Sequence, residues 1–342
     1  MKAFNKINFR NKADKFTVSF VIPVYKDYDG LDMTLNSIAH QQYRKCGKYT
    51  LEIIVVNDGG DREISGVCQK YKVKMVEIRP NCGSYLARNK GLEYSTGSII
   101  IFIDADVIIP PGWLEKALSA IDAVDYLAAD IRIDNNKIQT AVHSYQVSHS
   151  FPNAAYLEED HFGVTAGLVT RRRLVEQLGG FDSRLRSGGD KEFGIRVYHA
   201  GYKQAFLPSP TLVHPPKTLD RYLRSIKRIK QGHERLALFY PDTFSRPGFF
   251  QRLARFLRSL LPPRPTGINR RFSPDDGTAL LKKWFFLWLL KFFKGLYDLQ
   301  TWRLRFGKTV PQACPKVTFF DYYTPGGATK NFAIFRQDLT SK

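Results

Sequence analysis

The sequence predicts an α/β protein with a mostly parallel sheet, helices on both faces of that sheet, and a basic helical extension on its C-terminal side. Short apolar runs alternate with segments of helical periodicity between residues 16 and 104, which is the pattern of successive βαβ units. Polar and glycine-rich residues follow several of these runs, as they do where buried parallel strands end. Positive charge is concentrated beyond residue 220, where basic helical segments replace the strands.

The elements of the α/β part follow from this alternation. Short runs of apolar and β-branched residues predict strands at residues 16–25, 51–56, 74–78 and 98–103. Helical spacing of apolar residues predicts helices between them, at residues 31–42, 63–71 and 84–94. The later half is less regular, and its patterns predict strands at residues 126–133 and 165–170 and helices at residues 172–178 and 192–200. Because helices connect successive strands, the sheet is expected to be doubly wound.

Composition and charge divide the chain into three parts. With 342 residues and 43% hydrophobic content, the chain has the make-up of a folded protein and not of a disordered one. Residues 221–342 hold 24 Lys and Arg against 7 acids, whereas residues 1–220 have a net charge of only +3. Such a block favours an anionic surface as partner, either phospholipid headgroups or nucleic acid. We expect a polar lead at residues 1–15, an α/β domain at residues 16–220 and a basic amphipathic helical region at residues 221–342.

The cysteines and the N-terminal residues favour a reducing compartment. The four cysteines show neither a CxxC spacing nor a Cys/His ligand spacing, so the sequence indicates neither a zinc site nor a disulfide framework. Residues 1–6 carry charge but no apolar h-region, which argues against a signal peptide. We therefore expect a cytoplasmic location.

Two carboxylates follow the most apolar of the predicted strands. Asp104 and Asp106 are separated by Ala105 and come directly after residues 98–103, so both side chains point the same way if the backbone stays extended. Carboxylate oxygens are hard ligands that suit Mg²⁺ or Mn²⁺ carrying a diphosphate. The alternative is an acidic turn that caps the next helix. The position at the carboxyl end of a parallel strand favours the metal site.

Other polar motifs are expected at the same edge of the sheet. They occupy residues 23–25, 57–60, 81–83 and 87–91. Because the carboxyl ends of parallel strands lie together, these motifs converge on one crevice that fits a nucleotide. Asp58 could accept a hydrogen bond from a base, and Arg88 could bind a base or a phosphate. Taken singly, Asp58 is typical of a turn and Arg88 of a solvated helix surface.

The order of these motifs resembles that of the GT-A family 2 glycosyltransferases. The resemblance covers about residues 16–217 and is carried by residues 18–25, 55–59, 81–83, 87–91, 104–106, 179–182, 187–192, 196 and 213–214. It implies a Rossmann-like GT-A fold and an inverting transferase that uses a nucleotide-diphosphate sugar, with a UDP-sugar favoured. It also implies a hydroxyl acceptor on an envelope polysaccharide, a lipid-linked glycan or another cell-surface glycan precursor.

The resemblance also implies roles for individual residues. The floor of the nucleotide pocket would be formed by Pro23, Val24 and Tyr25, while Asp58 would contact the base and Arg88 would support the nucleotide. Residues 158–160 and 165–167 lie where relatives contact acceptors, although a solvated loop and a buried strand are equally typical readings.

In the same resemblance, Mn²⁺ or Mg²⁺ would be held by Asp106, with His214 as a further ligand, and Asp104 would face the ribose and the metal. Asp190 corresponds to the catalytic base, which takes the proton of the acceptor hydroxyl. The family usually has Glu directly before this Asp, and here Gly189 stands there. Glu192 and Arg196 have the i,i+4 spacing of a simple surface pair.

The basic region contains two amphipathic segments. In residues 249–261 the apolar residues share one helical face, and Arg252, Arg255 and Arg258 share the other. A second helix is expected at residues 282–306, whose longest apolar run covers only residues 284–290, far short of the about 20 residues that span a bilayer. We expect these helices to lie on the anionic inner face of the cell membrane. The alternative is packing against the catalytic domain or a partner subunit.

Two other functions are compatible with parts of the sequence. A nucleotidyltransferase would carry a glycine-rich basic loop after the first strand, and residues 23–28 have none. A nucleic-acid binder could use the basic region, but no RNA-binding aromatic motif or zinc-finger spacing accompanies it. A glycosyltransferase is therefore favoured, and no nucleic acid partner is expected.

Overall fold

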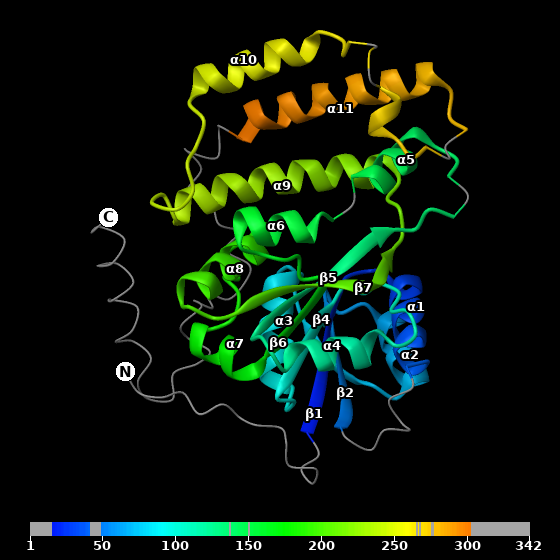
Figure 1. Cartoon of the computed structure of the whole chain (residues 1–342), viewed down its shortest axis with the longest axis vertical. Coiled ribbons are helices and arrows are strands. Elements are labelled where there is room, and N and C mark those ends of the chain that lie inside the picture. Colours follow the sequence, from blue (N-terminus) through cyan, green and yellow to red (C-terminus); the bar gives the residue numbers. More distant parts are fainter. Residues whose placement is uncertain are drawn as a thin grey trace.

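A computed structural model describes residues 16–41, 49–136, 138–149, 151–264, 266, 268–274 and 277–301. Its centre is one seven-stranded sheet of order β3-β2-β1-β4-β6-β5-β7, so the predicted α/β class is confirmed (Figure 1). The strands are β1 (Phe16–Val24), β2 (Tyr49–Asp58), β3 (Lys74–Ile78), β4 (Ile99–Ile103), β5 (Tyr126–Ile133), β6 (Gly167–Arg171) and β7 (Gln204–His214).

Helices cover both faces of the sheet, and three more form a layer beyond its carboxyl edge (Figure 1). Around the sheet lie α1 (Tyr28–Ala39), α2 (Arg62–Tyr71), α3 (Ser84–Tyr94), α4 (Trp113–Ile121), α6 (Asn153–Asp160), α7 (Arg172–Leu178) and α8 (Gly189–His199). Helix α5 (Ala141–Ser148) follows β5 and packs against the outer helices. The outer layer consists of α9 (Leu219–Phe239), α10 (Phe249–Leu260) and α11 (Leu280–Thr301), with a short 3₁₀ turn, η2 (Asn269–Arg271), before α11.

The sheet is mostly parallel, with one reversed strand. The pairs β1–β2, β1–β4, β2–β3 and β5–β7 are parallel, while β6 runs antiparallel to both β4 and β5. The expected strand at residues 165–170 is therefore present two residues later, and in the opposite direction to its neighbours. Helix α1 begins three residues before its predicted start, because the Asp27 carboxylate accepts a hydrogen bond from the Gly30 amide at 3.1 Å and so caps the helix.

The central strands are buried on both faces, which explains their uninterrupted apolar sequence. Successive side chains of a strand point to opposite faces, so Phe20 and Ile22 pack into a core with α1, α2 and α4. Val21 and Phe102 pack into a second core with α3, α7 and α8. All five residues of β4 are buried. The apolar run that suggested a doubly covered strand therefore forms one.

The carboxyl ends of the strands meet at one edge of the sheet. Val24, the last residue of β1, is paired with Asn57 near the end of β2, and β4 ends at Ile103, directly before Asp104. The turn after β4 also reaches the end of β7, because Ile108 and Val213 exchange backbone hydrogen bonds of 2.8 and 3.0 Å. This bridge brings the segment around Asp106 next to the last residue of β7.

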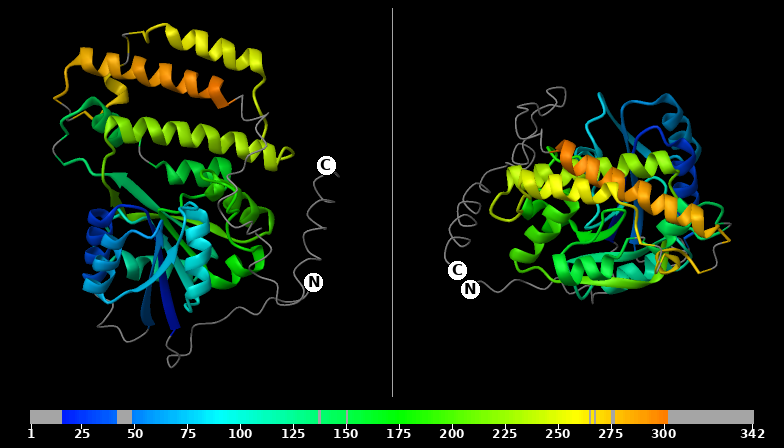
Figure 2. Two further views of the ribbon diagram at one scale, coloured as in Figure 1. Left: turned by 180° about the vertical axis from the view of Figure 1, so that it is seen from behind. Right: turned by 90° about the horizontal axis from the view of Figure 1, so that it is seen from above.

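The outer layer stacks on that same edge. Figures 1 and 2 show α9 nearest to the sheet, α11 beyond it and α10 outermost, with their axes roughly aligned. The predicted helix at residues 249–261 is α10, and the part of the predicted helix 282–306 after Thr301 lies outside the described residues. Within the described ranges, no helix has both the length and the apolar character needed to span a membrane.

Candidate active site

A cavity of about 560 Å³ lies between the carboxyl edge of the sheet and α9. Its lining includes every residue that the sequence singled out for donor binding, metal binding or catalysis: Pro23, Val24, Tyr25, Asp58, Arg88, Asp104, Ala105, Asp106, Asp190 and His214. These residues come from β2, α3, α8, β7, the turn after β4, and the end of β1 with the residue that follows it. The fold therefore brings together groups that are spread over nearly two hundred residues of sequence.

Asp58 organises the loop between β3 and α3. Its carboxylate accepts hydrogen bonds from the amides of Cys82 and Gly83, at 2.7 and 2.8 Å, and from the side-chain amide of Asn81 at 2.8 Å. Burial raises the pKa of Asp58, and these backbone hydrogen bonds act in the opposite direction. Asn81 is held in turn by Arg186, whose guanidinium donates to its side-chain oxygen at 2.7 Å and to its carbonyl at 3.0 Å. The carboxylate thus fixes one wall of the cavity.

Arg88 is not the solvated cation that its helical position suggests. Its side chain is buried on α3, lies over the ring of Tyr85 and donates from Nη2 to the carboxylate of Asp104. Its Nε has no hydrogen-bond partner among the described residues. Asp104 is therefore oriented by Arg88, and the cavity wall keeps one buried guanidinium donor without a protein acceptor.

Asp106 and His214 form a close pair at the end of the sheet. The Asp106 Oδ1 atom lies 3.4 Å from the His214 Nε2 atom. The His214 Nδ1 atom lies 2.7 Å from the carbonyl of Pro215, and donating a proton there leaves the Nε2 lone pair directed at Asp106. Burial raises the pKa of Asp106, and His214 acts against this shift. One carboxylate oxygen and one imidazole nitrogen at this spacing are a donor set that suits a divalent metal ion.

Few described side chains are placed to act as metal ligands at the cavity edge. In the described part of the chain, no cluster of three or more His, Cys, Asp or Glu side chains is arranged to hold an ion. Asp104, the third ligand expected from the sequence, forms an ion pair with Arg88. His214 lies next to Asp106 and not next to Asp104. Among the described residues, Asp106 and His214 are therefore the closest pair of possible ligands at this point of the cavity.

Asp190 is a partly buried carboxylate in the first turn of α8. Tyr85 donates its hydroxyl proton to the Asp190 Oδ1 atom at 3.1 Å, and the Lys191 amide donates to the same oxygen at 3.0 Å. Burial raises the pKa of Asp190, while Arg88 and these hydrogen bonds partly offset the shift. A carboxylate with a raised pKa is a stronger base than an ordinary Asp, which suits proton abstraction.

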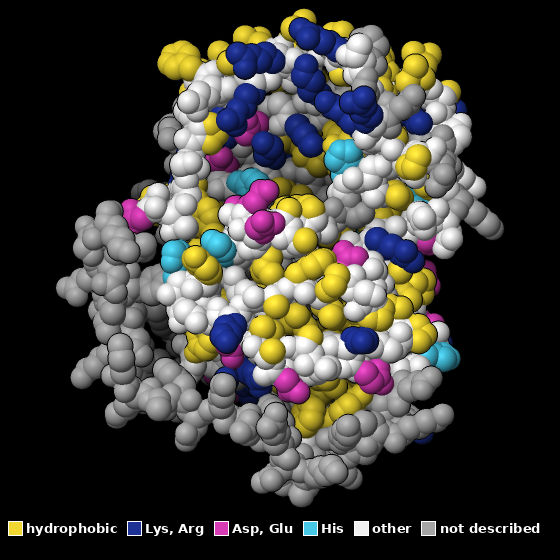
Figure 3. Space-filling model, in the orientation of Figure 1, with side chains coloured by type: hydrophobic (Ala, Val, Ile, Leu, Met, Phe, Trp, Pro, Cys, Tyr) yellow, Lys and Arg dark blue, Asp and Glu magenta, His cyan; other side chains and the backbone are white. Residues whose placement is uncertain are grey.

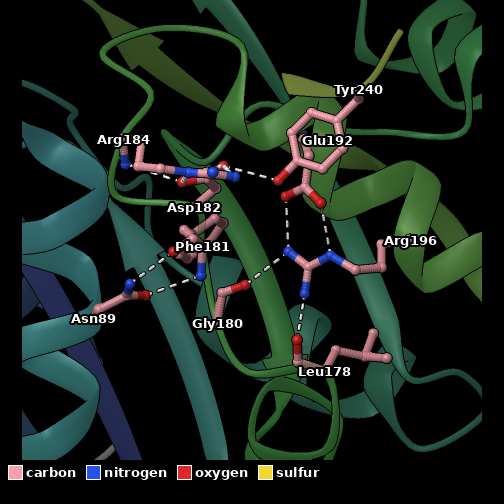
Figure 4. A network of polar contacts seen from close by, with 9 residues as sticks. All are labelled: Asn89, Leu178, Gly180, Phe181, Asp182, Arg184, Glu192, Arg196 and Tyr240. Carbon is pink, nitrogen blue, oxygen red and sulfur yellow. Dashed lines mark hydrogen bonds and ion pairs between the residues drawn. The ribbon is translucent and has the colours of Figure 1, made fainter. Parts of the chain in front are cut away.

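A buried network fixes the segment that leads to Asp190 (Figure 4). The Asn89 side chain bonds both the carbonyl and the amide of Phe181, at 2.8 and 2.9 Å. Arg196 donates to the carbonyls of Gly180 and Leu178 and forms a two-pronged ion pair with Glu192, with both distances 2.7 Å. Glu192 and Arg196 are buried, so the surface-pair interpretation of their spacing is wrong. Their helical spacing serves to clamp the turn after α7.

The same network reaches α9 (Figure 4). Tyr240, directly after α9, donates to the Asp182 carboxylate at 2.8 Å, and Arg184 binds that carboxylate with two nitrogens. Burial alone would raise the pKa of Asp182, but the bonds from Arg184 and Tyr240 outweigh it and hold that pKa below its usual value. Gly232 of α9 lies against Ser187, where a Cβ would come within 2.6 Å of the Ser187 carbonyl oxygen. The outer layer and the Asp190 segment are therefore packed as one unit.

Several cavity residues were missed by sequence reasoning. Helix α9 begins almost at the predicted boundary of residue 220, yet Ser225, Arg228 and Ile229 line the cavity. Lys217 and Arg186 line it as well. Burial, with Arg228 nearby, lowers the pKa of Lys217. The sequence signal for Arg228 was the positive charge of residues 221–342, which predicts an external anionic partner and not a cavity wall. Of the two expected acceptor segments, Thr165 and Ala166 lie in the cavity wall.

Comparison with known proteins agrees with the order of the motifs. Residues 19–179 match the family model described as Glycosyl transferase family 2. Residues 19–179 therefore have the sequence features of a family 2 glycosyltransferase domain. It is 28% identical over 255 residues to the glycosyltransferase AglE of Haloferax volcanii, a match that covers 72% of this chain and 82% of AglE. It is also 28% identical over 186 residues to the uncharacterized glycosyltransferase YwdF of Bacillus subtilis, covering 53% of this chain and 67% of YwdF.

Two solved structures are similar to the chain. One is the mannosyltransferase PcManGT from Pyrobaculum calidifontis in complex with GDP-Man and Mn²⁺, at 15% identity and a TM-score of 0.49, covering 96% of this chain and 82% of that one. The other is S. aureus TarS in complex with UDP, at 19% identity and a TM-score of 0.49, covering 86% of this chain and 93% of that one. The family 2 match ends before Asp190 and His214, so their place in the cavity is known from the fold of this chain.

Proposed function

We propose that this family 2 glycosyltransferase moves a sugar from a nucleotide-diphosphate sugar, with a UDP-sugar favoured, to a hydroxyl of a glycan or lipid-linked acceptor with inversion at the anomeric carbon. The observation that carries the proposal is the convergence of three groups in one cavity. They are the Asp106–His214 pair, the ion pair of buried Arg88 with Asp104, and the carboxylate of Asp190. A donor site and a proton acceptor therefore share one space.

The Asp106–His214 pair is the proposed site of Mn²⁺ or Mg²⁺. Its carboxylate oxygen fits either ion, and its imidazole nitrogen suits Mn²⁺ better than Mg²⁺. When bound, the ion would stabilise the negative charge that develops on the departing diphosphate. Asp104 is kept beside this pair by Arg88, where it is available to a donor ribose or to the ion.

The cations of the cavity wall support binding of an anionic donor. Arg88, Arg186, Lys217 and Arg228 all line the cavity. Burial and Arg228 lower the pKa of Lys217, so a negative ligand relieves an unfavourable cluster of charge. Tyr25 offers an exposed ring next to Gly59, at the carboxyl end of β2, where a base can stack. These residues bind and orient the donor.

Asp190 is the proposed base. As the acceptor oxygen attacks the anomeric carbon, the bond from that carbon to the diphosphate oxygen breaks and the hydroxyl proton passes to the Asp190 carboxylate. Tyr85 and the Lys191 amide hold one carboxylate oxygen, which leaves Oδ2 for the proton. One base is sufficient, because a single displacement inverts the configuration.

The donor site is tested by thermal unfolding of the full chain with UDP, GDP and dTDP, each with and without Mn²⁺. We expect one nucleotide to raise the melting temperature in a metal-dependent way, because a ligand that binds only the folded state stabilises it. Asp106→Ala should abolish the metal-dependent part of the shift, whereas Asp190→Asn should retain it. If no nucleotide shifts the wild type with or without metal, the donor-site proposal is wrong.

A further inference from the structure

The outer layer presents large apolar side chains to solvent. The most exposed are Phe250 at 82% and Leu261 at 64% on α10 or at its end, and Leu281 at 75% on α11. Leu257 and Phe285 are each more than half exposed. Figure 3 shows hydrophobic side chains along the upper rim of the molecule, where these helices lie, with Lys and Arg side chains next to them. We call these five residues the outer apolar face. Apolar groups gathered at one end of a folded protein mark an interaction surface.

Helix α10 is attached to the molecule through two buried polar side chains, Arg252 and Ser259. Arg252 is 1% exposed and donates to the Asp298 carbonyl at 2.9 Å, to the Thr301 hydroxyl at 3.1 Å and to the Glu234 carboxylate. Ser259 is buried against Gly295, where a Cβ would come within 2.5 Å of the Ser259 hydroxyl oxygen. The sequence grouped Arg252 with Arg255 and Arg258 on the face opposite the apolar residues, and of these three only Arg252 is buried. The helix therefore buries one charged side chain while it exposes Phe250.

The apolar residues of the two helices belong to one surface. The Trp288 indole of α11 donates to the Leu260 carbonyl at 3.2 Å, and the Trp284 indole donates to the Pro263 carbonyl at 2.9 Å. Lys291 donates to the Leu261 carbonyl at 3.0 Å. These bonds hold the end of α10 against α11. Tryptophan side chains of this kind are enriched where a protein meets the headgroup region of a bilayer.

The charge beside this face has one sign. Residues 249–301 contain ten Lys and Arg and only three Asp. Among the described residues of α10 and α11, the only acid is Asp298, and it is buried. Arg258, Arg264 and Lys282 are exposed. Apolar side chains flanked by exposed cations complement an anionic phospholipid surface, whose headgroups attract the cations while the apolar residues enter the acyl boundary.

We propose that the outer apolar face docks the protein on an anionic phospholipid surface and presents the cavity to molecules held in that surface. Helix α9 carries the second part of the proposal. Its Arg228 and Ile229 line the cavity, while its Glu234 binds Arg252 of α10 and its Lys230 lies 3.4 Å from Asp298 of α11. One helix therefore joins the cavity to the docked layer. A lipid-linked acceptor suits this placement, an inference that rests on the proposed transferase function.

The test is flotation of the full chain with phosphatidylcholine vesicles that contain either 30% or no phosphatidylglycerol. We expect binding to the anionic vesicles, a strong decrease in 0.5 M NaCl, and at least a tenfold loss for Phe250→Ser/Leu257→Ser. The matched control is Met33→Ser/Tyr94→Ser, which removes two exposed apolar side chains from the α/β part and should bind like the wild type. Arg258→Gln/Lys282→Gln should weaken binding to the vesicles that contain phosphatidylglycerol and should not change binding to pure phosphatidylcholine vesicles.

Each contrary result overturns the proposal in a distinct way. Absence of wild-type binding to either vesicle excludes lipid docking. Equal loss in the Phe250/Leu257 and Met33/Tyr94 variants shows that the outer apolar face is not the contact. Concentration-dependent dimers that are abolished by Phe250→Ser/Leu257→Ser, without vesicle binding, assign the face to a second copy of the chain. Nucleotide-induced stabilisation is measured on the same proteins, so failure of docking is distinguishable from failure of the proposed transferase function.

Discussion

The α/β part and the outer layer place their apolar and charged side chains differently. In the α/β part the cores are apolar, and ionisable groups such as Asp106 and Asp190 gather at one edge around a cavity. In the outer layer, Arg252 and Asp298 are buried between helices, and apolar side chains such as Phe250 face outward. The first arrangement concentrates chemistry at a site. The second leaves an apolar surface available for contact, at the cost of burying a polar junction.

The largest expected effect tests the chemical role of the cavity edge. Asp190→Asn should lower the transfer rate about 10²- to 10⁴-fold, because it removes the base. It should also raise the melting temperature slightly. Burial raises the pKa of Asp190, so the ionised carboxylate destabilises the folded state at neutral pH and the neutral amide does not. Product formation and thermal unfolding measure the two effects, and a variant that retains the wild-type rate would remove Asp190 from the mechanism.

The next effect tests the buried polar junction of the outer layer. Arg252→Met should lower the unfolding free energy by about 3–5 kcal/mol, because it removes the ion-pair partner of the buried Glu234 carboxylate. Asp298 keeps its contacts with Lys230 and Arg255. Arg258→Met, on the exposed side of the same helix, should change it by less than about 0.5 kcal/mol. Urea unfolding followed by circular dichroism measures both. Equal stability of the two variants would show that the junction does not determine how α10 is mounted.

A pH profile separates the cavity edge from an ordinary surface. Because the pKa of Asp190 is raised by burial, kcat at saturating donor should fall as the pH drops through that raised value, approaching about tenfold per pH unit. The Tyr85 hydroxyl bond lowers the pKa of Asp190, so Tyr85→Phe should move the acid limb to higher pH. Tyr28→Phe, at an exposed position on α1, is the control. A limb that stays in place in Tyr85→Phe would contradict the assignment of the base.

The smallest effect tests the link between the two regions. Tyr240→Phe removes the 2.8 Å bond to the Asp182 carboxylate and should lower the unfolding free energy by about 1–3 kcal/mol, the range for a buried hydrogen bond to a charged group. Tyr94→Phe, at an exposed position, should leave it within about 0.5 kcal/mol. Urea titrations compare the two variants. A neutral Tyr240→Phe would mean that the regions are joined by packing alone.

The sequence was most informative where backbone rules determine position. Parallel strands must end on a common edge, so the convergence of Asp58 and Asp104 on one crevice could be predicted without knowing any side-chain contact. Asp190 lies in the first turn of α8, and only the resemblance to family 2 glycosyltransferases indicated it. The arrangement of the outer layer could not be predicted. Helical periodicity identified two faces of α10, but nothing local decides which residues are buried, and the Glu234 and Thr301 partners of Arg252 lie 18 and 49 residues away.

The spacing of Glu192 and Arg196 also does not predict whether their side chains are buried. Glu192 and Arg196 are as compatible with a solvated pair as with a buried clamp, since the difference arises from Gly180 and Leu178, which belong to another segment. Arg88 is a second example, because its burial depends on Tyr85 and Asp104 together. In both cases tertiary packing, which no sequence window contains, determines the environment of the charge.

The bridge between Ile108 and Val213 delays formation of the Asp106–His214 pair until late in synthesis and folding. Asp106 is synthesised more than one hundred residues before His214, and their donor atoms come within 3.4 Å only when β7 has joined β5 and the turn after β4. A nascent chain that ends before β7 lacks this donor pair even if its first four strands are complete. The proposed affinity for a divalent ion would therefore arise only late in folding, once nearly the whole sheet is assembled.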